Sequence, residues 1–201
     1  MRLEKTDRQD REEFKVWLNK NDFDKLVTYA PTTKHELIIR LCGECGLRSH
    51  EVPQIKPRNY YESSREKGEY LLKIPEGKDT TGKGGKFRTT YLPKGLWSDL
   101  EKYKRENQIK QTKPLFDHTP RHIRRLVKAV ATNTEKETGI EDFQYLSSHD
   151  LRRFFAHYNL VEKGKNPKVI QKLGGWEDYQ AIKPYLGEPS EENRNYEEII
   201  L

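Results

Sequence analysis

Two strand-like segments that flank a turn-rich stretch constrain the fold more than any other feature of this chain. Residues 69–74 (EYLLKI) and 86–92 (KFRTTYL) are rich in residues that favour strands, and residues 77–85 between them hold four glycines. This pattern predicts a β-hairpin with a long, basic tip. Because most of the remaining periodicity is helical, we expect a mainly α fold with one small antiparallel β-sheet, in the α+β class.

The helical segments are marked by apolar stripes and by caps at their ends. The sequence Thr33-Lys-His-Glu36 is typical of a capping box and opens a helix over residues 33–45, which ends at Gly46. Ser147 or Ser148 caps a later helix. Apolar spacing also predicts a short amphipathic helix within residues 7–20, a helix over 96–108, one from Pro120 onward and a short one over 168–173.

Composition and length set limits on the class of protein. The 201 residues suit a single domain, and the net charge of +6 favours an anionic partner. No apolar run approaches the roughly 20 residues of a membrane span, and the N-terminus has no apolar signal region, so we expect a cytoplasmic protein. Cys42 and Cys45 lack a second pair of zinc ligands nearby, and we expect them to be buried on the apolar face of a helix.

Three short segments carry residues that suit phosphate chemistry. His149 and Arg152 are three residues apart, so they share one face of a predicted helix. Arginine forms bidentate hydrogen bonds with phosphate, and a neighbouring histidine can donate a hydrogen bond or relay a proton. Arg48 directly follows a helix end and precedes Glu51, which also fits a simple Arg48–Glu51 salt bridge. Taken alone, each pattern also fits an ordinary charged surface.

Tyr185 is the candidate nucleophile, nine residues after Trp176 and directly after Pro184. A phenol with an ordinary pKa near 10 reacts slowly at pH 7. Flanking arginines would stabilise the phenolate and the charge that develops on phosphorus. Most tyrosines in proteins serve only for packing, so this assignment depends on the arginines lying nearby.

Read in order, GLRSHEV, the basic hairpin, HDLRRFF and LGGW with a tyrosine nine residues later resemble the catalytic domain of the tyrosine recombinase (phage integrase) family. The resemblance covers about residues 30–187 and implies that family's catalytic-domain fold. It implies that two arginines clamp the scissile phosphate, that a histidine assists, that an indole N–H binds the phosphate and that a tyrosine attacks it. These residues are Arg48, Arg152, His149, Trp176 and Tyr185.

The resemblance also implies supporting roles. Glu51 and Asp150 match acidic positions that orient neighbouring basic groups. A hairpin lysine serves as the general acid for the leaving 5′-hydroxyl, and Lys78 is favoured over Lys83 because the first strand ends there. Lys83, Lys86 and Arg88 are also expected to contact the DNA backbone.

The implied activity is site-specific cleavage and rejoining of double-stranded DNA by a recombinase or integrase, through a 3′-phosphotyrosine intermediate. The implied partners are DNA and further copies of the chain, as a tetramer, with no metal or cofactor. We expect residues 1–201 to form one catalytic domain without the family's N-terminal DNA-clamping domain. Residues 188–201 would dock on a neighbouring subunit, or else fray or pack on their own chain. The alternatives are a type IB topoisomerase-like enzyme, a non-catalytic DNA-binding module and an unrelated RNA-binding protein.

Overall fold

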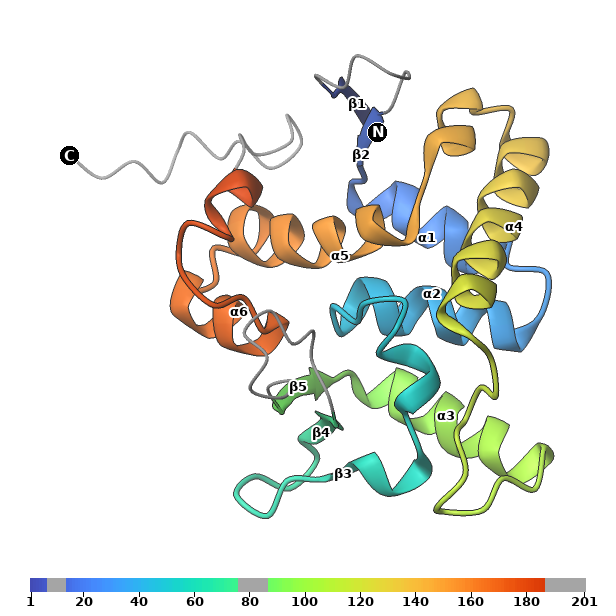
Figure 1. The fold of residues 1–201 in the computed structure, drawn as a ribbon, viewed down its shortest axis with the longest axis vertical. Coiled ribbons are helices and arrows are strands. Elements are labelled where there is room, and N and C mark those ends of the chain that lie inside the picture. Colours follow the sequence, from blue (N-terminus) through green and yellow to red (C-terminus); the bar gives the residue numbers. More distant parts are fainter. Residues whose placement is uncertain (7–13, 76–86, 187–201) are drawn as a thin grey trace.

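The computed structural model describes residues 1–6, 14–75 and 87–186, which form a helical bundle with a small sheet against one side (Figure 1). The longer helices are α1 (Lys20–Thr28), α2 (Thr33–Glu44), α3 (Lys94–Glu106), α4 (Pro120–Thr138), α5 (Ser148–His157) and α6 (Pro167–Gly174). Short helical turns are η1 (Val52–Gln54), η2 (Pro57–Asn59), η3 (Glu141–Tyr145), η4 (Tyr158–Glu162) and η5 (Lys183–Tyr185). No helix in these described ranges is both long and apolar enough to cross a membrane.

The predicted hairpin strands pair as expected. Strands β3 (Tyr60–Glu62), β4 (Tyr70–Ile74) and β5 (Arg88–Leu92) form an antiparallel sheet in that order, with Leu71 opposite both Tyr61 and Tyr91. The hairpin tip, residues 76–86, lies outside the described residues. The inner face of β5 carries Arg88, Thr90 and Leu92, because side chains alternate along a strand.

The expectation of only one sheet was wrong, and so was that of a helix over residues 14–17, whereas residues 7–13 of the predicted 7–20 helix lie outside the described residues. Strands β1 (Arg2–Lys5) and β2 (Phe14–Trp17) form a second antiparallel sheet, with Leu3 opposite Val16. A distant side chain contributes to this outcome, because the Val16 backbone N–H donates to an Asp150 carboxylate oxygen at 3.1 Å. Helix α1 starts only after Asn19, whose side chain caps it.

Helix α2 lies at the centre of the bundle, against α1, α3, α4 and α5 (Figure 1). Its apolar side chains are fully buried on several faces, as expected for a helix surrounded by others. These side chains are Leu37, Ile38, Ile39, Leu41 and Cys42. Cys45 is buried as well, so both cysteines pack in the core as predicted.

The turn after α2 is built around a glycine. Gly46 has a φ of 67°, in the left-handed region, and a Cβ there would lie 2.6 Å from Phe155 Cδ1. Only glycine therefore lets the chain turn this closely past α5 and direct Arg48 toward α6. At the start of the same helix the cap is Thr32, one residue before the predicted Thr33.

Candidate active site

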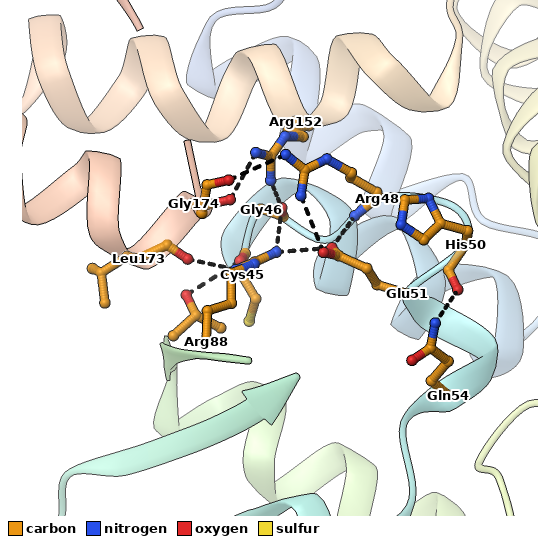
Figure 2. Close-up of polar contacts among 12 residues, drawn as sticks. Cys45, Gly46, Arg48, His50, Glu51, Gln54, Arg88, Arg152, Leu173 and Gly174 are labelled. Atoms are coloured by element: carbon orange, nitrogen blue, oxygen red, sulfur yellow. Dashed lines mark hydrogen bonds and ion pairs between the residues drawn. The ribbon is translucent and has the colours of Figure 1, made fainter. Parts of the chain in front are cut away.

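Arg48 and Arg152 come from distant segments and meet at the end of α6. The Arg152 Nη2 group donates to the Gly174 carbonyl at 2.7 Å, and the Arg48 Nη2 group donates to the next carbonyl, that of Gly175, at 3.3 Å (Figure 2). Arg152 also donates to the Gly46 carbonyl in the turn after α2. The two guanidinium groups are therefore held side by side by backbone carbonyl groups.

Arg88 adds a third guanidinium group to this cluster. It donates to the carbonyl groups of Gly46, at 3.1 Å, and of Leu173, and it pairs with Glu51 (Figure 2). The sequence predicted a DNA contact for Arg88, but the residue is only 8% exposed because it lies on the inner face of β5. The alternation with Thr90 and Leu92 is the sequence signal for this inward position.

Glu51 is the carboxylate that two of these arginines share. It is fully buried and accepts hydrogen bonds from the Arg48 backbone N–H at 2.7 Å, from Arg48 Nη1 at 3.2 Å and from Arg88 Nη2 at 2.8 Å. Burial alone raises the pKa of Glu51, but the attraction of Arg88 and Arg48 outweighs it and holds the pKa below its ordinary value. Glu51 is therefore ionised and orients both guanidinium groups.

The cluster carries more positive than negative charge. Among the described residues of this cluster, three guanidinium groups, those of Arg48, Arg88 and Arg152, are balanced by one carboxylate, that of Glu51. Burial, together with the charges of Arg48 and Arg88, lowers the pKa of Arg152 to about 9, so Arg152 still keeps its charge at pH 7. An anion bound at this position would relieve the repulsion between the guanidinium groups.

Trp176 and Tyr185 complete the site from the segment after α6. The Arg152 guanidinium carbon lies 4.0 Å from the centre of the Trp176 ring, a cation–π contact, and the Tyr185 ring centre lies 5.4 Å from that of Trp176. Tyr185 is 8% exposed, and it lies close enough to Arg152 to raise the pKa of that residue slightly. Gly174 makes room for the indole, because a Cβ there would lie 1.7 Å from Trp176 Cζ3.

The first turn of α5 holds the two other predicted residues of this helix. His149 is exposed and has no hydrogen bond to a described residue. Although His149 is exposed, the neighbouring side chains remove part of its hydration and lower its pKa, and the charge of Arg153 lowers it further, so the ring is neutral at pH 7. Asp150 caps α5 by accepting from the Ser147 N–H at 2.8 Å, and it pairs with Arg153 rather than with Arg48 or Arg152.

Several predicted site residues lie outside the described parts of the chain, namely Lys78, Lys83 and Lys86. The tail at residues 188–201 lies outside them as well. Within the described ranges, no three His, Cys, Asp or Glu side chains are placed to hold a metal ion.

Most of the chain matches one known protein family. The model of the phage integrase family matches residues 16–191. The chain belongs to the phage integrase family. Tyrosine recombinase XerA of Pyrococcus furiosus is 26% identical over 170 residues, which are 84% of this chain and 56% of XerA. The integrase of Salmonella phage P22 is 42% identical over 50 residues, which are 25% of this chain and 12% of that integrase.

Solved structures share the fold of this member of the phage integrase family. The crystal structure of XerA recombinase has a TM-score of 0.68 at 20% identity, over 87% of this chain and 61% of that one. The Tn1549 transposon integrase in complex with transposon right end DNA has a TM-score of 0.72 at 13% identity, over 92% and 66%. The predicted catalytic-domain fold is confirmed. The chain spans 56% of the length of the XerA relative.

Proposed function

We propose that this phage integrase family member cleaves and rejoins DNA strands, with Tyr185 forming a transient 3′-phosphotyrosine bond. The observation that carries this proposal is the meeting of Arg48, Arg152, Trp176 and Tyr185 in one positively charged cluster at the end of α6. The relatives support it, since XerA is named a tyrosine recombinase and a structural neighbour, XerH, is described as bound to its difH substrate in a pre-cleavage complex.

In the proposed first step, the Tyr185 oxygen attacks the phosphorus of a DNA phosphodiester. The bond from phosphorus to the 5′-oxygen breaks, the phenol loses its proton, and the leaving 5′-oxygen gains one. Arg48 and Arg152 stabilise the charge on the pentacoordinate phosphorus, and the Trp176 indole N–H is a further donor. Fixed donors of this kind contribute about 100- to 1,000-fold each to the rate. In the second step a 5′-hydroxyl attacks the phosphotyrosine bond and restores the DNA backbone.

The remaining roles follow from the family resemblance and from the geometry. His149 is neutral and unpaired with other described side chains, so we assign it to assist proton transfer beside the phosphate. The general acid is assigned to a hairpin lysine, Lys78 in preference to Lys83, with Lys86 on the DNA backbone. Arg88 has three protein acceptors, so we assign it to holding Glu51 instead of DNA.

The proposed partner is double-stranded DNA, bound by a tetramer of this chain in the cytoplasm. The fold neighbours support DNA as the substrate, because the XerH and Tn1549 integrase structures are described as complexes with DNA. The net charge of +6 agrees with an anionic partner.

Covalent trapping tests the proposal. The chain is incubated with a pool of duplexes that carry a nick close to each possible cleavage point. Cleavage then releases a short strand, rejoining fails, and the adduct survives denaturing electrophoresis. Mass spectrometry maps the modified residue, which we expect to be Tyr185. The Tyr185→Phe variant should form no adduct and still bind the duplexes. Tyr179→Phe is the matched control, because Tyr179 is 47% exposed in the same segment. An adduct that persists in Tyr185→Phe would end the proposal.

A further inference from the structure

We propose that His157 is a positioning residue, which holds the backbone of the segment that carries the nucleophile. This inference rests on the proposed function and adds a residue to it. His157 is the last residue of α5 and is 8% exposed. Its Nδ1 atom lies 3.2 Å from the carbonyl oxygen of Tyr185. Since a carbonyl oxygen only accepts, Nδ1 must carry the proton and donate it.

The segment that carries Tyr185 has little structure of its own to hold it. It is a three-residue helical turn, η5, with the Tyr185 N–H donating to the Ile182 carbonyl at 2.9 Å. Short turns of this type have poor hydrogen-bond geometry and are held by their surroundings. In the described ranges of the chain, His157 is the side chain that hydrogen-bonds to the backbone of η5. The ring of Tyr185 packs with Trp176 and Ile182 in an apolar cluster, so packing places the ring and His157 fixes the main chain.

The imidazole of His157 is itself fixed from two other sides. Its Nε2 atom lies 3.7 Å from a carboxylate oxygen of Glu162. The edge of the ring meets Trp17 at 5.4 Å between centres and an interplanar angle of 73°. Trp17 in turn donates its indole N–H to Glu4 at 2.9 Å. Through these contacts the N-terminal sheet β1–β2 supports the back of the proposed active site.

This arrangement predicts which step His157 affects. An in-line attack on phosphorus is sensitive to small displacements of the attacking oxygen, and a shift of 1 Å can slow such a step about 100-fold. His157 is 8% exposed, and its ring contacts the Tyr185 carbonyl, Trp17 and Glu162, so it has no free face with which to bind a phosphate. Its loss should therefore slow the cleavage step and leave DNA affinity nearly unchanged.

Three substitutions separate the hydrogen bond from the bulk of the ring. His157→Asn puts an amide nitrogen near the position of Nδ1, His157→Gln puts one near Nε2, and His157→Leu fills space without a donor. We expect adduct formation on the nicked duplexes to be within about threefold of the parent chain for His157→Asn. It should be about 10- to 100-fold slower for His157→Gln and His157→Leu, with dissociation constants for DNA within about twofold throughout.

A second readout needs no DNA and detects the hydrogen bond between His157 and the Tyr185 backbone directly. Amide hydrogen–deuterium exchange over residues 182–186 should be faster in His157→Leu and His157→Gln than in the parent chain and in His157→Asn. Equal cleavage rates in His157→Leu and the parent chain would overturn the inference, as would equal exchange in all variants. If the parent chain itself forms no adduct, the proposed function fails, and the exchange experiment still decides whether His157 holds η5.

Discussion

Replacing Glu51 by glutamine should destabilise the fold strongly, because this carboxylate holds two guanidinium groups inside the protein. Glu51 is fully buried and the Arg88 side chain is 6% exposed, so water cannot replace the lost charge. Removing one partner of a buried ion pair typically costs about 3–5 kcal/mol of unfolding free energy. Glutamine keeps one oxygen that can accept a hydrogen bond, so we expect about 3 kcal/mol for E51Q. For a chain of this size that corresponds to a fall in Tm of about 6–12 °C at pH 7.

The pH dependence gives a second check on the same variant. The folded-state pKa of Glu51 lies below its ordinary value of 4.5. The stability that the charge contributes is therefore present above that value and is lost as the pH falls through the lower, folded-state pKa. Thermal unfolding of the parent chain and of E51Q should differ most near neutral pH, and the difference should shrink in acid.

The matched control is Glu106→Gln. Glu106 is 55% exposed and lies 3.9 Å from Lys102, so this surface pair is worth at most about 1 kcal/mol. Its loss should lower the Tm by less than about 4 °C. If E51Q lowers the Tm no more than E106Q does, the buried carboxylate is not what holds the guanidinium groups together.

Two further predictions test the turn after α2 and the core beside it. Gly46→Ala should cost about 2–4 kcal/mol of unfolding free energy in urea, because the new Cβ would clash with the Phe155 ring and the left-handed φ would strain an alanine. Gly139→Ala, at a φ of 68° with open space around it, should cost only about 1–2 kcal/mol. Equal losses in the two variants would contradict the packing argument. Burial raises the pKa of Cys42 to about 12 and raises that of Cys45 as well, so a thiol reagent at pH 8 should modify them only as the chain unfolds. Rapid modification of the folded chain would show that the turn opens in solution.

The sequence alone determined most of the local structure and the candidates for catalysis. Proline, glycine and capping residues have strong local preferences, so the starts of α4 and α5 and both ends of α6 were predicted to within about one residue. The order of the arginine, histidine, tryptophan and tyrosine motifs indicated the family. These signals depend on residues that lie close together in the sequence, so they can be recognised before the fold is known.

Only the tertiary structure decided which residues from distant segments pair with one another. Residues 14–17 have apolar spacing that fits a helix, yet they form a strand that pairs with the N-terminus and is bonded to Asp150. Arg88 turns inward because Glu51 and the carbonyl groups of Gly46 and Leu173 surround its guanidinium group. His157 reaches the Tyr185 carbonyl across 28 residues of chain. Such contacts depend on geometry between elements, and a buried charge takes whichever partner the packing brings within reach.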